Sequence, residues 1–148
     1  MFGIEFLRFR ASAPVPMLDN EWSAEQLPHP ETIAFEAGEA FSRSNDRRML
    51  TCGPYLPLGK GYYEFAISYR SPAARHNLCG FWDITADKGT KVLDRGPLLG
   101  TLGEPAVLKM VLYLDRNQSD VEFRSYSEGA GKVFVKSIRI KRLEDRRH

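Results

Sequence analysis

The sequence is short of the residues that build disulfide frameworks and metal centres. Its 148 residues contain two cysteines, Cys52 and Cys79, and three histidines, His29, His76 and His148. Two cysteines cannot form the several bridges of a disulfide-stabilised scaffold. We expect both to be free thiols, with one bridge between them as the alternative. The histidines lack the spacing of a zinc site, so we expect them to be exposed in loops.

Long apolar runs and an excess of charge are missing too. No segment approaches the ~18 apolar residues of a membrane span. The segment 1–10 carries Glu5, Arg8 and Arg10, so we do not expect a signal peptide there. The cellular location stays open, with the cytoplasm slightly favoured. A net charge of +2 gives no electrostatic basis for binding nucleic acid. Neither nucleic acid nor a membrane span is therefore expected.

Alternation of apolar and polar residues is the clearest pattern present. Tyr63, Phe65, Ile67 and Tyr69 occupy every second position of 62–70, and a period of two predicts a half-buried strand. The stretch 53–61 before it holds two prolines flanked by glycines, which is typical of a turn. This region predicts a turn that leads into a long strand with one apolar face.

Short strands of this kind recur along the chain, separated by glycine and proline. They are expected at 2–10, 32–36, 40–44, 48–52, 78–85, 91–94, 107–115, 121–126 and 133–140. A hairpin turn is predicted at 87–89, a loop from Gly96-Pro97 onward, a β-bulge near Lys136-Ser137, and at most one short helix at 22–27. We predict one all-β domain over 1–148, an antiparallel, jelly-roll-like β-sandwich. In it, 1–30 form an N-terminal strand and connector, 31–142 the core sandwich and 143–148 a tail.

Signatures of catalysis are missing. The sequence has no phosphate loop, nucleophile elbow or dinucleotide fingerprint. Glu64 and Glu122 would resemble the carboxylate pair of a glycosidase if their strands faced each other. Ion pairing of these glutamates with Arg70 or Arg124 is the favoured interpretation. We therefore do not expect an enzyme.

Side chains suited to sugar recognition lie on outward positions of several strands and in loops. Sugars are bound by flat aromatic faces together with polar groups for the hydroxyls. Tyr113 and Tyr126 would share one surface if their strands belong to one sheet, although ordinary cross-strand pairing explains them as well. For Trp82, packing in the core is the favoured alternative. The predicted ligand-binding residues are Tyr55, Arg70, Trp82, Asp83, Tyr113, Glu122, Arg124 and Tyr126.

The order of these motifs resembles jelly-roll carbohydrate-binding-like modules of the galactose-binding-like superfamily, as found in bacterial polysaccharide-related proteins. The resemblance is carried by the proline–leucine, glycine and tyrosine entry at 53–63, the opening motif at 32–41, and two late strand motifs. These last are Val121-Glu122-Phe123-Arg124 and Ile138-Arg139-Ile140. The resemblance covers roughly residues 30–142. It implies a non-catalytic module that binds a glycan and assists an enzyme encoded elsewhere.

Calcium is a cofactor of some of these resembling modules. There, two glutamates of the opening motif and an aspartate near the last strand bind the ion. Glu36 and Glu39 match the glutamates with an extra residue between them, while the late position has Val135-Lys136-Ser137 and no acid. Because calcium requires oxygen ligands, we expect no cofactor, with calcium at Glu36 and Glu39 as the alternative.

Two other functions stay open from the sequence. The apolar segment 2–9 would serve a protein-interaction or assembly module, including a homodimer, as an intermolecular strand. A small enzyme on the same fold is the less favoured alternative.

Overall fold

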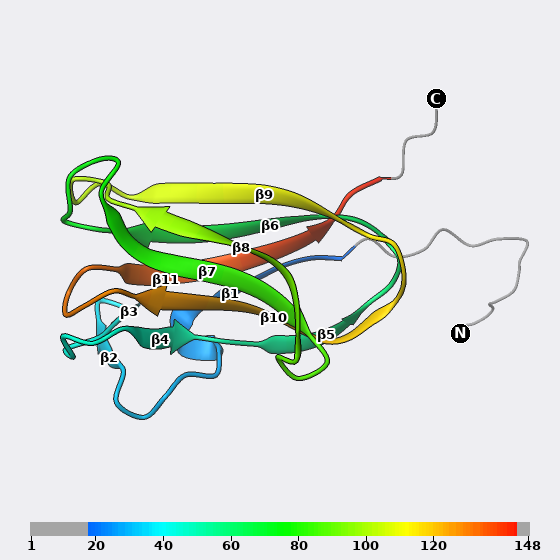
Figure 1. Cartoon of the computed structure of the whole chain (residues 1–148), viewed down its shortest axis with the longest axis horizontal. Coiled ribbons are helices and arrows are strands. Elements are labelled where there is room, and N and C mark those ends of the chain that lie inside the picture. The colour runs from blue at the N-terminus through cyan, green and yellow to red at the C-terminus, as the bar shows by residue number, and fades with distance from the viewer. Residues whose placement is uncertain (1–17, 145–148) are drawn as a thin grey trace, which may run out of the picture.

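Two antiparallel β-sheets packed face to face form the molecule, as the computed structural model shows for residues 18–144 (Figure 1). Only one 3-10 helix, η1 (Ala24–Gln26), interrupts the strands of this region. The predicted all-β, antiparallel sandwich is confirmed. The expected strand at 2–10, and with it the assembly segment 2–9, lies outside the described residues.

The first sheet has the order β2-β3-β11-β6-β9, and β1 also pairs with β11. Its strands are β1 (Asp19–Ser23), β2 (Ala34–Glu36), β3 (Glu39–Phe41), β6 (Gly61–Arg70), β9 (Ala106–Leu114) and β11 (Phe134–Arg142). β1 forms from residues that the sequence suggested were part of a connector.

The second sheet has the order β4-β10-β7-β8, and β5 also pairs with β10. Its strands are β4 (Arg48–Thr51), β5 (Pro54–Leu58), β7 (Leu78–Ala86), β8 (Lys91–Leu99) and β10 (Gln118–Ser127). The long strands of both sheets run along the length of the molecule (Figure 1).

The core lies between the sheets and is built on the alternation of β6. The four predicted inward residues of this strand are all buried: Tyr63, Phe65, Ile67 and Tyr69. Across the interface, the ring of Phe65 meets the ring of Phe123 from β10 edge to face, with 5.6 Å between centroids. Burial of this aromatic and aliphatic surface is the main source of stability for the sandwich.

The predicted turn at 53–61 is wrong over Pro54–Leu58, which form β5. The strand pairs with β10 through Leu58↔Gln118 and Leu56↔Val121. β5 pairs with no strand other than β10 among residues 18–144, so its prolines break no ladder. Only 3% of Leu58 is exposed. The burial of this apolar side chain favours the place of the segment in the sheet despite its turn-like composition.

The loop predicted from Gly96-Pro97 onward is wrong as well, because β8 continues to Leu99. β8 is at the edge of its sheet, where proline is tolerated. Gly96 pairs with Trp82 of β7, and a Cβ at position 96 would lie 2.7 Å from Cζ2 of the indole. A residue without a side chain is therefore required beside the buried tryptophan.

Local features of the remaining chain follow the sequence closely. Positive φ angles at Asp87 and Lys88 form the predicted hairpin turn between β7 and β8. A shift of register between Val135 and Ser137 in the pairing of β11 with β6 marks the predicted bulge. Ser23 caps η1 through a reciprocal pair of hydrogen bonds with Gln26, as its sequence position allows.

Cys52 and Cys79 are both free thiols, the first half-buried and the second buried. Among residues 18–144, no helix is long and apolar enough to cross a membrane.

Candidate functional site

The outer face of the second sheet carries two adjacent rows of side chains set by the strand register. The aromatic row consists of Phe81 on β7 and its cross-strand partner Tyr126 on β10, and it is extended by Pro97, the partner of Phe81 on β8. The charged row lies two residues away from the aromatic row on each strand, and it consists of Arg95 on β8, Asp83 on β7 and Arg124 on β10. Two residues along a strand span about 7 Å, so the two rows lie side by side on this face.

A pocket of about 590 Å³ opens on this face. Its walls come from both rows and from Arg47, which precedes β4. The lining residues are Arg47, Phe81, Trp82, Asp83, Arg95, Gly96, Pro97 and Tyr126. The pocket therefore combines half-buried rings with charged groups, as ligand sites commonly do.

Asp83 and Arg124 form a two-point ion pair at the centre of the charged row. Nε and Nη2 of Arg124 donate to the two carboxylate oxygens at 2.8 and 2.7 Å. Both side chains are largely buried, with 15% and 19% exposed. The hydrogen bond to Asp83 raises the pKa of Arg124, so the guanidinium is a permanent, fixed cation.

Tyr126 is held as a neutral phenol. Partial burial raises its pKa above the ordinary value of 10, and the negative charge of Asp83 acts in the same direction. At neutral pH the ring thus offers an aromatic face and an O–H donor. The guanidinium carbon of Arg124 lies 5.9 Å from its ring centroid.

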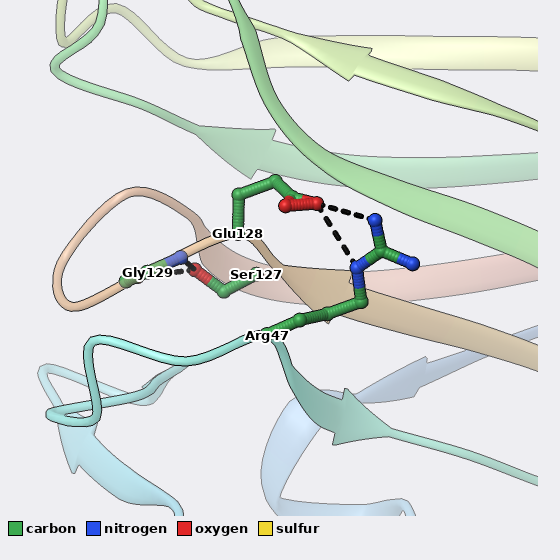
Figure 2. Close-up of polar contacts among 4 residues, drawn as sticks. All are labelled: Arg47, Ser127, Glu128 and Gly129. Atoms are coloured by element: carbon green, nitrogen blue, oxygen red, sulfur yellow. Dashed lines mark hydrogen bonds and ion pairs between the residues drawn. The ribbon is translucent and has the colours of Figure 1, made fainter.

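Arg47 closes the end of the pocket over the aromatic row. Its guanidinium carbon lies 4.4 Å from the ring centroid of Phe81, a cation–π distance. Its Nε and Nη2 donate to Oε1 of Glu128 at 2.9 and 2.7 Å (Figure 2). The Ser127 hydroxyl donates to the carbonyl of Gly129 at 2.6 Å and accepts a hydrogen bond from the backbone N–H of Gly129 at 3.5 Å (Figure 2). These bonds support the turn that presents Glu128.

Glu122 and Tyr55 continue the same face beyond the charged row. Glu122 pairs with Thr85 of β7 and Pro54 of β5, and it is 6% exposed. The Tyr55 hydroxyl lies 3.5 Å from the thiol of Cys52. This hydrogen bond and burial raise the pKa of Tyr55. The structure thus brings together five of the predicted residues: Tyr55, Asp83, Glu122, Arg124 and Tyr126.

Of the other three predicted residues, one is a buried part of the pocket wall and two belong to the first sheet. Trp82 borders the pocket but is only 7% exposed, and its ring packs against Phe123 in the core. Tyr113 lies on the outer face of the first sheet, where its ring is 4.7 Å from that of Tyr62. Arg70 belongs to the first sheet as well and pairs with Glu39 at 2.9 Å. The condition for a shared surface of Tyr113 and Tyr126 is not met, because β9 and β10 belong to different sheets.

The two glutamates suggested for calcium are partners in the β2–β3 hairpin. Glu39 is occupied by Arg70, whose Nε donates to its carboxylate at 2.9 Å. Among residues 18–144, no group of three or more His, Cys, Asp and Glu side chains is placed to hold a metal ion. Glu64 alternates with the buried Tyr63 and Phe65, and Glu122 alternates with the buried Val121 and Phe123. The two glutamates therefore point to the outer faces of different sheets and do not form the facing carboxylate pair considered from the sequence.

Sequence reasoning missed several residues of the pocket. Phe81 of β7 pairs with Pro97 of β8, and Arg95 of β8 pairs with Asp83 of β7. The alternation of 78–85 already placed Phe81 on the same side of its strand as Asp83. Arg47 had no such signal, because it reaches the pocket only through the pairing of β4 with β10, about 75 residues away in sequence.

Comparison with known proteins identifies the fold. No protein-family model and no curated protein matches the sequence. Solved carbohydrate-binding modules of family 6 do match in structure. The C-terminal module of LamC, a marine laminarinase of Zobellia galactanivorans, has a TM-score of 0.61 and 13% identity over 84% of this chain and 99% of that chain. The fold of this chain is that of carbohydrate-binding modules.

Two further modules agree with this result. Module CBM6cm-2 of Cellvibrio mixtus lichenase 5A, solved with cellotriose, has a TM-score of 0.58 and 15% identity, covering 84% of this chain and 98% of its own. A family 6 module of Clostridium cellulolyticum, solved with xylose, has a TM-score of 0.59 and 16% identity, covering 80% and 94%. The resemblance stated from the sequence is confirmed for the fold.

Proposed function

We propose that this chain is a non-catalytic glycan-binding module whose sugar site is the pocket on the outer face of the second sheet. The observation that carries the proposal is the pair of adjacent rows, in which the rings of Phe81 and Tyr126 lie beside the ion pair of Asp83 and Arg124. An aromatic row takes the C–H face of a sugar ring, and a charged row takes its hydroxyls.

The ion pair favours binding because it is already ordered. Arg124 uses Nε and Nη2 on Asp83, which leaves Nη1 and further carboxylate lone pairs for a ligand. Two hydrogen bonds hold both side chains in place, so little rotamer freedom is lost when a sugar arrives. This site orients hydroxyl groups, and its carboxylate is engaged by an arginine rather than poised to transfer a proton.

The structural relatives support a sugar as ligand, since two of those modules were solved with cellotriose and xylose. Their likeness to this chain lies in the fold, and the position of the site rests on the pocket itself. The pocket is open and partly polar, so we expect weak binding to a single sugar unit and stronger binding to a polymer.

The test is affinity electrophoresis and calorimetry of the purified chain against a panel of soluble polysaccharides. Phe81→Ala and Tyr126→Ala are expected to weaken binding about tenfold or more, because an aromatic contact of this kind contributes ~1.5 kcal/mol. Tyr113→Ala is the matched control, since it removes an exposed tyrosine from the opposite sheet. Circular dichroism verifies that each variant is folded.

Two results would contradict the proposal. Binding that survives both pocket variants but is lost in Tyr113→Ala would place the site on the first sheet. A folded chain that binds no member of the panel would remove the function itself.

A further inference from the structure

One of the three arginines around the pocket has a side chain that no carboxylate pairs with among residues 18–144. Three arginines are involved, of which Arg47 and Arg95 line the pocket and Arg124 lies beside it. Arg47 is paired with Glu128 and Arg124 with Asp83. Among residues 18–144, the guanidinium of Arg95 has no hydrogen-bond or ion-pair partner. The bond from Arg95 to the carboxylate of Asp94 is donated by the backbone N–H of Arg95.

The carboxylate nearest in register to Arg95 is already paired with another arginine. Asp83 is its cross-strand partner, yet both oxygens of Asp83 accept hydrogen bonds from Arg124. Arg95 is exposed on the edge strand β8, so its side chain is accessible to a ligand that lies on the aromatic row. A guanidinium offers a planar set of donors that matches a carboxylate or sulfate group.

We infer, on the basis of the proposed function, that the glycan is acidic and that Arg95 binds its anionic group. The sugar ring contacts Phe81 and Tyr126, while a carboxylate or sulfate on that ring, or on the next one, reaches the guanidinium of Arg95. The ion pair of Asp83 and Arg124, which lies next to the rings and to Arg95, binds hydroxyl groups of the sugar. This arrangement selects uronic acid or sulfated polymers over neutral polymers of the same backbone, because only the former compensate the charge of Arg95.

The experiment compares two matched pairs of polymers. Polygalacturonate is compared with its carboxyl-reduced form, and a sulfated galactan with its desulfated form, by calorimetry at low salt. We expect at least one acidic member to bind about tenfold more tightly than its neutral partner. The preference should shrink as sodium chloride is raised, because salt screens an exposed charge pair.

Arg95→Gln is expected to abolish this preference, so that the acidic and neutral members of each pair bind with equal affinity. Arg116→Gln is the control, because it removes the same charge from an exposed arginine outside the pocket, and it should preserve the preference. Arg95→Lys should retain part of it, since the charge remains and the planar fork is lost. Unfolding by urea verifies that the variants are equally stable.

The outcomes separate this inference from the proposed function. Equal binding of acidic and neutral members overturns the acidic preference and leaves glycan binding standing. An acidic preference that Arg95→Gln does not change overturns the assignment to Arg95. Failure of the folded chain to bind any polysaccharide, neutral polymers included, overturns both.

Discussion

Arg124 and Asp83 face each other across the pairing of β10 with β7 and share two hydrogen bonds of 2.8 and 2.7 Å. This pair separates the aromatic row from Glu122 and Tyr55, so it fixes the middle of the proposed sugar site. It also sits on a largely covered surface, with less than a fifth of either side chain exposed. Its loss should therefore affect stability and binding together.

Asp83→Asn is predicted to destabilise the protein by ~2 kcal/mol. The variant keeps the shape of the side chain but leaves the guanidinium of Arg124 without a counter-charge in a place with little water. The free energy of unfolding in urea measures the effect. Asp115→Asn is the control, because its pair with Arg116 is about 70% exposed on both sides, and it should change stability by less than ~0.5 kcal/mol. Equal effects of the two variants would contradict the prediction.

Gly96→Ala is predicted to destabilise the core by ~1–3 kcal/mol, because the added methyl group would meet the Trp82 ring at 2.7 Å and overpack it. Unfolding in urea, followed by tryptophan fluorescence, measures both the stability and the displacement of the indole. Gly59→Ala is the matched control, since the nearest atoms to its new Cβ lie 3.6 Å away. A wild-type spectrum and midpoint for Gly96→Ala would show that the ring has room to move.

Local pattern predicted the strands better than it predicted their partners. The alternation of β6 and the bulge in β11 follow from neighbouring residues and were both found from the sequence. β5 was missed because its two prolines are typical of turns, and its place beside β10 depends on residues about 60 positions later. What the sequence does not encode locally is which sheet each strand joins.

The candidate site depends on those partners. Arg124 and Tyr126 were found because each is an outward residue of an alternating strand, whereas Asp83 was predicted as a residue in or beside a loop. Tyr113 looks equivalent in sequence, yet β9 pairs with β6 in the first sheet, which places this tyrosine on the opposite side of the sandwich. Arg47 joins the site from a turn before β4, where no periodicity exists to indicate its direction.

Arg142→Ala is predicted to loosen the turn between β5 and β6. The Arg142 guanidinium donates to the Tyr63 hydroxyl and to the carbonyl of Lys60, both at 2.7 Å, and the Tyr63 hydroxyl donates to the carbonyl of Gly59 at 2.7 Å. Removal of this network should cost ~1–2 kcal/mol and increase hydrogen exchange at 59–63. Lys141→Ala serves as the control, because no hydrogen bond from its side chain is found among residues 18–144. Unchanged exchange at 59–63 would contradict the role given to Arg142.

Stability is predicted to fall at alkaline pH, starting near pH 9. Burial raises the pKa of the Cys79 thiol above its ordinary value of 9, and burial likewise raises the pKa of Tyr69 and Tyr126 above 10. The native state therefore holds these protons more tightly than the unfolded chain does. Their contribution to stability is fully present below about pH 9 and is lost as the pH rises toward the native pKa values.

Urea midpoints measured from pH 7 to pH 10.5 test this expectation, with two variants that separate the groups. Cys79→Ala should flatten the decline that begins near pH 9, because it removes the buried thiol. Tyr126→Phe should act only above pH 10, and it keeps the aromatic ring, so glycan binding at pH 7 should change much less than in Tyr126→Ala. A midpoint that stays constant to pH 10.5 in the wild-type chain would mean that these groups titrate in the native state as they do in the unfolded chain, and burial would then not be the cause of the shifts.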